Sequence, residues 1–194
     1  MGGWVWWPCS CCDSGGVRVT VFDSLSPPYG TIVADPPWRY ASAATKADAR
    51  KHYSTMSMDE IASMPVGDLA APDAHLWFWC TNALMEDGYR IVRAWGFAPI
   101  TLVTWCKPGP GVGYYLRNNT EHAIFATRGK PVVPEDKPLS TWFQWPRAQH
   151  SVKPDAFGDL VEKVSPGPYV ELFARQPRLG WDSWGHGYET AVPA

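Results

Sequence analysis

The sequence predicts an α/β domain of three layers built around a mostly parallel sheet. Short apolar runs alternate along the chain with segments of helical spacing, which is the pattern of strands joined by crossover helices. The chain has 194 residues, 45% of them hydrophobic and 19% charged, so its length and composition fit one globular domain.

The expected strands are apolar runs bounded by turn residues: 17–22, 31–34, 75–80, 99–106, 121–127 and 169–174. Three segments carry helix signals. A capping box at Ser57–Glu60 predicts a short helix that ends near Ser63. Apolar spacing predicts a second helix over Leu84–Trp95, which Gly96 ends. Pro154–Val164 reads as a third helix with proline at its start.

The first sixteen residues are expected to form a poorly ordered extension before a folded domain over 17–190. They lack the basic and apolar regions of a signal peptide. They contain Cys9, Cys11 and Cys12, but no second ligand pair follows at zinc-like spacing, so no metal is predicted. No run reaches the ~18 apolar residues of a membrane span, so we expect a cytoplasmic protein that does not bind a membrane.

The net charge of −2 argues against a protein that coats nucleic acid through bulk charge, but it leaves room for a local basic patch. In a parallel sheet, ligands bind outside the carboxyl ends of the strands. The polar residues that follow the predicted strands should therefore line one crevice: Asp35, Asn82, Lys107 and Arg175. The long loops 39–55 and 130–151 are expected to hang over the same edge.

The tetrapeptide Asp35-Pro36-Pro37-Trp38 directly follows the apolar run 31–34. A carboxylate at Asp35 and the carbonyl of Pro36 can both accept hydrogen bonds from an exocyclic amino group, and Trp38 can stack on a planar base. This combination suits a site that grips adenine by its amino nitrogen. The alternative is a strand end with a turn and a buried tryptophan, and the tetrapeptide by itself leaves that alternative open.

Two C-terminal segments add a second set of charged residues. Lys153 precedes the last predicted helix, where its ammonium group can pair with a ligand carboxylate. Glu171 and Arg175 lie at the end of the last strand, where they suit ribose hydroxyls and an amino-acid group, and a turn rich in tryptophan and glycine follows. An ordinary salt bridge with packing explains each residue equally well when it is taken alone.

Taken in order, these segments resemble the N(6)-adenine methyltransferase family that includes the catalytic subunit of the eukaryotic mRNA adenosine methyltransferase, and small prokaryotic and phage DNA adenine methyltransferases in particular. The resemblance runs from about Thr31 to His186. It rests on these motifs in sequence order: 35–38, 53–57, 105–107, 121–122, 150–154 and 171–175 with the turn after it. It implies a Rossmann-like fold over 17–190, S-adenosylmethionine as the cofactor, and the catalytic motif ahead of the main cofactor segment.

The resemblance also implies roles for individual residues. The catalytic loop would be Asp35, Pro36, Pro37 and Trp38, and Asp35 would also border the cofactor. The acceptor pocket would be bordered by Tyr53, Lys107, Glu121 and His122. The cofactor would be held by Lys153, Glu171, Arg175 and His186. His186 and Ala174 stand where the eukaryotic pattern has Asn and Gly, and Asp23 is a candidate for the adenine-binding acid.

The predicted reaction is methyl transfer to the amino group of adenine in nucleic acid, with DNA favoured over RNA. Three alternatives remain: the same chemistry on RNA, a cofactor-binding partner without activity, and a nucleic-acid-binding module that uses exposed aromatic residues. No separate target-recognition domain is visible, so sequence preference would come from the two long loops, aided by a second copy in a homodimer or by a partner subunit.

Overall fold

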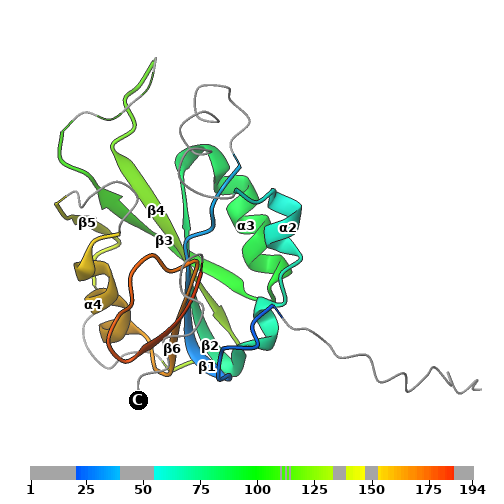
Figure 1. Cartoon of the computed structure of the whole chain (residues 1–194). Helices are drawn as coiled ribbons and strands as arrows, with labels where there is room; N and C mark the ends of the chain where they lie inside the picture. Colours follow the sequence, from blue (N-terminus) through cyan, green and yellow to red (C-terminus); the bar gives the residue numbers. More distant parts are fainter. Residues whose placement is uncertain are drawn as a thin grey trace, which may run out of the picture.

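A computed structural model describes residues 21–39, 55–109, 111, 113, 115–132, 139–146 and 153–185. They form one seven-stranded sheet in the order β5-β3-β4-β2-β1-β6-β7, and helices cover both of its faces (Figure 1). The strands are β1 (Tyr29–Ala34), β2 (Ala70–Cys80), β3 (Ala98–Cys106), β4 (Thr120–Arg128), β5 (Trp142–Gln144), β6 (Tyr169–Leu172) and β7 (Trp181–Trp184). The predicted Rossmann-like α/β class with a mostly parallel sheet is confirmed.

The helices are α2 (Met58–Ala62), α3 (Met85–Ala94) and α4 (Asp155–Val164), with 3-10 turns η1 (Val66–Asp68) and η2 (Asn82–Leu84). The capping box predicted for α2 is present, with Ser57 and Glu60 bonding each other's backbone. Gly96 ends α3 with a φ of 85°, and the amide N–H groups of Gly96 and Phe97 donate to the carbonyls of Arg93 and Val92. Only the left-handed conformation closes these two bonds, and glycine adopts it without strain.

Two apolar clusters hold the layers together. On one face, Ile61 of α2 and Ile91 of α3 pack with Leu76 and Phe78 of β2, and all four side chains are fully buried. On the other face, Phe157 of α4 packs on Trp79, whose ring centroid lies 4.6 Å away. Side chains alternate between the two faces along each strand, so β2 supplies both clusters and reads as a nearly continuous apolar run.

Strand β4 runs antiparallel to both of its neighbours, β2 and β3, whereas the other strand pairs are parallel. The loop that follows β4 therefore starts at the edge opposite the carboxyl ends of the parallel strands. The prediction that all of loop 130–151 hangs over the ligand edge is wrong for this reason. The β3–β4 connection lies at that edge instead, and in Figure 1 it rises beyond the rest of the sheet.

Three further predictions are corrected. The predicted strand 17–22 is wrong at its described end, since residues 21–24 form a turn, and its residues 17–20 lie outside the described residues. Phe22 packs edge-on against Trp184 with ring centroids 5.0 Å apart. Strand β5 lies inside the segment predicted as a long loop, and β7 replaces the turn expected around Trp181. The described residues include no helix long and apolar enough to cross a membrane. The predicted extension over 1–16 lies outside the described residues, and the domain boundary remains a prediction.

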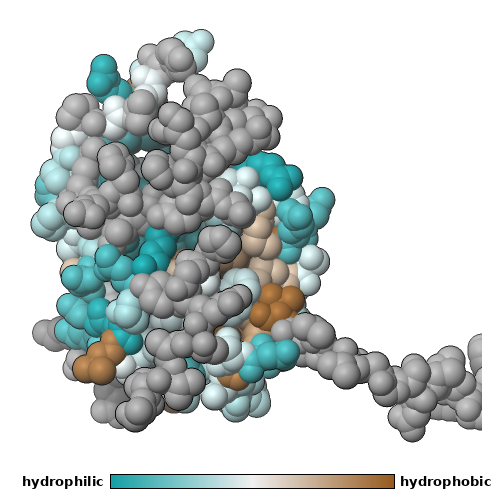
Figure 2. Space-filling model, viewed as in Figure 1, coloured by the Kyte–Doolittle hydropathy of each residue, from teal (hydrophilic) through white to brown (hydrophobic). Residues whose placement is uncertain are grey.

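The face drawn in Figure 2 shows its strongly hydrophobic described residues as separate spots among hydrophilic ones, not as one broad patch. The fully or largely exposed apolar side chains of the described chain are similarly spread over several elements, from Val21 before β1 to Leu179 before β7. Single exposed apolar residues are normal on protein surfaces.

Candidate active site

Asp35 leaves β1 at the carboxyl edge of the sheet, where its backbone N–H donates to the carbonyl of Leu172 in β6. Its side chain is only 12% exposed. Lys153, just before α4, donates from Nζ to Asp35 Oδ2 at 2.7 Å, and Arg175 Nη2 lies 3.7 Å from the same oxygen. The predicted carboxylate is therefore held between two cations at the mouth of the sheet.

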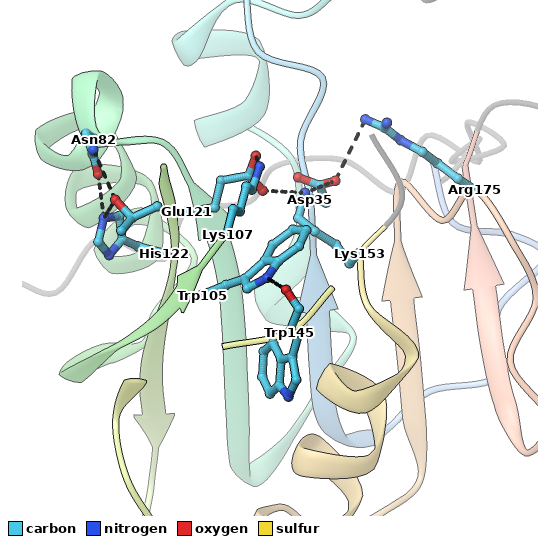
Figure 3. A network of polar contacts seen from close by, with 10 residues as sticks. Asp35, Asn82, Trp105, Lys107, Glu121, His122, Trp145, Lys153 and Arg175 are labelled. Carbon is cyan, nitrogen blue, oxygen red and sulfur yellow. Dashed lines mark hydrogen bonds and ion pairs between the residues drawn. The ribbon is translucent and has the colours of Figure 1, made fainter. Parts of the chain in front are cut away.

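The same lysine extends the cluster toward β3 and β4. Lys153 Nζ lies 3.6 Å from Glu121 Oε2, and the other oxygen of Glu121 accepts a short hydrogen bond from Lys107. Burial alone would raise the pKa of Glu121, but the ammonium groups of Lys153 and Lys107 outweigh it and hold that pKa below its ordinary value. Figure 3 shows these side chains converging from the ends of separate strands and, for Lys153, from the segment before α4. We call Lys107, Glu121, Lys153, Asp35 and Arg175 the edge cluster.

The edge cluster brings together residues that the sequence predicted to share one crevice. Asp35, Lys107 and Arg175 belong to it. Asn82 lies at the same edge, but it bonds His122 and Thr120 instead. Figure 3 shows the Asn82–His122 pair apart from the line of charges that leads to Asp35.

His122 faces the opposite side of the sheet from Glu121, because successive residues of a strand point to opposite faces. Its ring nitrogens contact Thr104 Oγ1 at 3.0 Å and the side-chain oxygen of Asn82. Burial lowers its pKa, so the ring is neutral near pH 7. The structure does not bring His122 to the edge cluster, in contrast to the sequence prediction that it borders the same pocket as Glu121.

The loop after Asp35 is fixed by backbone bonds to the start of the next described segment. Trp38 N–H donates to Pro36 O at 2.9 Å, and Met56 N–H donates to Pro37 O at 2.9 Å. The Trp38 ring is 6% exposed and meets Phe78 edge-on, with centroids 5.6 Å apart. Stacking of Trp38 on a base, as predicted, is corrected: its faces are covered by the core, where it anchors the loop. Pro36 O keeps one lone pair for another donor.

A pocket opens between the ends of β1 and β6 and the start of α4, beside the edge cluster. Its walls include Val33, Trp79, Glu171, Phe173 and Arg178. Desolvation, with a further contribution from the nearby Asp35 carboxylate, raises the pKa of Glu171 to about 7. Phe173 takes a φ of 64°, a left-handed conformation that is costly for an aromatic residue and that is typical of functional sites.

With this geometry established, the comparisons with known proteins decide the family. Residues 29–187 match the MT-A70 family over most of the chain. The chain belongs to the MT-A70 family. The resemblance to the adenine methyltransferases is thereby confirmed, and so is the prediction that the chain is a methyltransferase.

The share of a relative's length that this MT-A70 chain matches differs from one relative to the next. It is 30% identical to the type II methyltransferase M.MunI of Mycoplasma sp, over 81% of this chain and 76% of that protein. It is 28% identical to a putative N(6)-adenosine-methyltransferase MT-A70-like protein of Medicago truncatula, over 90% of this chain but 28% of that protein. It is 24% identical to the human catalytic subunit METTL3, over 85% of this chain and 28% of METTL3.

Some predicted residues of this MT-A70 chain lie outside the described residues, namely Tyr53 and His186. Asp23 is described and lies exposed in the turn before β1. Sequence reasoning missed the aromatic floor of the edge cluster: Lys153 Nζ lies 4.9 Å above the ring of Trp79, and Lys107 Nζ lies 4.5 Å above that of Trp105. The sequence did contain a signal for this floor. Trp79 and Trp105 each lie near the end of a predicted strand, and the alternation of faces along a strand predicts the side of the sheet to which each ring points.

Arg178 was also missed. It bonds Glu162 Oε1 at 2.8 Å and Asp159 Oδ1 at 2.6 Å, both on α4, and so fastens the β6–β7 connection across the pocket wall. Gly158 leaves the space for it, because a Cβ there would lie 2.4 Å from Arg178 Nη1. A lone arginine in a loop carries no sequence signal for such a clamp, since its partners lie on a different element.

Proposed function

We propose that this chain transfers the methyl group of S-adenosylmethionine to the exocyclic amino group of adenine in nucleic acid, with DNA as the favoured polymer. The observation that carries the proposal is the position of Asp35. Its carboxylate stands at the end of β1, 12% exposed, next to the pocket that Glu171 and Arg178 line. A hydrogen-bond acceptor for an amino group thus borders a pocket whose walls carry both charged and aromatic side chains.

The residues of the pocket fit S-adenosylmethionine by charge and hydrogen bonding. Lys153 and Arg175 are cations that suit its carboxylate, and the carboxyl of Glu171 suits the ribose hydroxyls. The cofactor supplies a methyl group on a sulfonium, which leaves as a neutral thioether when the carbon–sulfur bond breaks. Lys153, Glu171 and Arg175 are therefore our candidates for cofactor binding, with Asp35 at the boundary between cofactor and acceptor.

The contribution of the acceptor side is alignment. Asp35 accepts a hydrogen bond from the adenine amino group, and Pro36 O offers a second acceptor, so the lone pair of the nitrogen is turned toward the methyl carbon. A nitrogen–carbon bond forms as the carbon–sulfur bond breaks, and the amino group then loses a proton to solvent. Holding reactants in this way can lower a barrier by roughly 7–11 kcal/mol. Lys107 and Glu121 are our candidates for the acceptor side. Tyr53, the third candidate from the sequence, lies outside the described residues.

DNA is favoured because the chain covers 76% of the type II methyltransferase M.MunI but 28% of METTL3. The second candidate polymer is RNA, because METTL3 and the plant relatives are named N(6)-adenosine-methyltransferases. A catalytically inactive partner subunit is a third reading, and the intact Asp35–Pro36–Pro37 segment weighs against it.

The test is transfer of tritium from labelled S-adenosylmethionine to matched DNA and RNA oligonucleotides by the isolated chain. We expect Asp35→Ala to abolish transfer while cofactor binding, measured by calorimetry, largely survives. Asp87→Ala, on the exposed face of α3, is the matched control and should retain activity. Near-normal transfer by Asp35→Ala would refute the assignment, and transfer to RNA alone would replace DNA as the substrate.

A further inference from the structure

The connection between β3 and β4 carries two apolar side chains that touch almost nothing else in the described structure. Tyr115 is 101% exposed and Leu116 is 84% exposed, and Arg117 follows them at the surface. The other exposed large apolar residues of the described chain stand singly in the sequence, whereas Tyr115 and Leu116 are adjacent.

This connection forms a narrow finger, by which we mean residues 107–120. At its base, Lys107 N–H donates to Asn119 O at 2.7 Å, and Asn82 Nδ2 donates to Asn118 Oδ1 at 3.2 Å. Its two arms lie so close that a Cβ on Gly111 would come within 1.4 Å of Asn118 O. Glycine is required at that point, and the tip is held at a defined distance from the sheet.

The finger rises from the proposed acceptor side of the site. Lys107 begins it and Glu121 directly follows it, and these two residues bond each other within the edge cluster. Figure 1 shows the chain between β3 and β4 standing out beyond the carboxyl edge. In the sheet order β2 alone separates β4 from β1, whose end carries Asp35, so the finger flanks the edge that an adenine must reach.

We propose that the tip of the finger is a wedge for double-stranded nucleic acid. Leu116 and Tyr115 enter the duplex beside the target adenine and occupy the stack that the adenine leaves, and Arg117 contacts a neighbouring phosphate. This inference rests on the proposed function, because it assumes that the adenine leaves its duplex to reach Asp35. Apolar side chains that insert between base steps, and aromatic rings that stack on exposed bases, are the usual means of stabilising such an opening.

A protein partner fits the tip less well. A tyrosine and a leucine together bury at most roughly 400 Å², since even a large aromatic side chain buries about 150–250 Å². A stable protein interface needs about 800 Å² on each side. Two adjacent apolar side chains beside a cation instead suit insertion between base steps and a contact with the phosphate backbone.

The test compares methylation of the same adenine-containing DNA oligonucleotides as single strands and as matched duplexes. The wedge acts only where a base must leave a stack, so the measured quantity is the ratio of the duplex rate to the single-strand rate. We expect this ratio to fall roughly ten-fold or more in the double variant Tyr115→Ala, Leu116→Ala, given the contribution of one aromatic stack. A mismatch opposite the adenine should restore most of the loss.

Ile100→Ala is the matched control, because Ile100 is 61% exposed near the start of β3, at the opposite edge of the sheet. Its ratio should equal that of the unaltered chain. An unchanged ratio in the double variant, or an equal loss on single strands and duplexes, would overturn the wedge.

A second readout does not depend on methylation. Duplexes with 2-aminopurine at the target position should brighten when the unaltered chain binds, and the double variant should brighten them less. If the unaltered chain methylates neither form, the proposed function fails, while equal brightening by both proteins refutes the wedge alone. A change in oligomeric state on removal of the two side chains would also overturn it, in favour of a second copy at the tip.

Discussion

Replacing Lys153 by methionine tests whether the edge cluster is held together by one shared cation. Lys153 contacts two carboxylates, Asp35 at 2.7 Å and Glu121 at 3.6 Å, and its side chain is 18% exposed. Methionine keeps most of the volume and the apolar contact with Trp79 but removes the charge. The variant therefore separates the ionic contribution from packing.

The expected loss follows from burial and from what remains. Removing one partner of a buried ion pair costs about 3–5 kcal/mol, because the other charge stays buried without compensation. Arg175 still lies 3.7 Å from Asp35, and Lys107 still bonds Glu121, so part of that cost is recovered. We expect a loss of about 2–3 kcal/mol in the free energy of unfolding near pH 7, which lowers the melting temperature by roughly 5–10 °C.

The pH dependence of this stability loss tests the role of Lys153 independently. Because Lys153 helps to hold the pKa of Glu121 below its ordinary 4.5, this pair stabilises the fold above pH 4.5 and loses its effect as the pH falls through the folded-state value. The difference between the two proteins should thus be full near pH 7 and shrink in acid. Urea denaturation at several pH values measures it.

The control is Lys163→Met, which removes an exposed lysine from the last turn of α4. An exposed substitution of this kind changes stability by no more than about 0.5 kcal/mol. A loss in Lys153→Met no greater than that of the control, or a loss of the same size at every pH, would refute the shared-cation interpretation.

Two further predictions concern the pocket beside the edge cluster. Glu171 has a pKa of about 7 against an ordinary 4.5, so the native state should lose stability as the pH rises from 4.5 to 7, by at most ~3 kcal/mol. Glu171→Gln should flatten this dependence of stability on pH, as measured by urea denaturation at several pH values. An unchanged pH dependence in the variant would contradict the raised pKa. Gly158→Ala should push Arg178 away from its carboxylate partners on α4 and so weaken cofactor binding several-fold, as measured by calorimetry. The better helix propensity of alanine, up to ~1 kcal/mol, should offset the cost in stability. Unaltered cofactor affinity would show that the contacts of Arg178 with α4 do not shape the pocket.

Much of the fold follows from local sequence signals. The capping box of α2, the glycine that ends α3 and the proline before α4 each fix an element boundary through backbone chemistry within a few residues. The signals fail where pairing at long range decides. β5 has three residues and pairs with β3, and within the described residues β7 pairs with β6 alone. Neither strand has an apolar alternation long enough to be seen in sequence.

The candidate site was predictable to the extent that it follows from strand ends. Asp35, Lys107 and Arg175 were expected at one edge because each follows an apolar run, and the structure places them in one cluster. The ion pairs among them were not predictable, since Lys153 lies 118 positions from Asp35. Trp38 shows the converse: its motif suggests a stacking surface, yet the deep apolar cluster around Phe78 draws the ring inside.

The direction of β4 connects the fold to its proposed chemistry. A fully parallel sheet would join neighbouring strands by crossover helices that cover its faces and begin at the ligand edge. Because β4 is antiparallel, its amino end meets the carboxyl end of β3 there, and a hairpin replaces the crossover. That reversal delivers Glu121 to the same edge as Lys107 and leaves the finger, with Tyr115 fully exposed on it, projecting from that edge. The direction of β4 therefore supplies both Glu121 of the edge cluster and the finger that, in our proposal, opens the duplex.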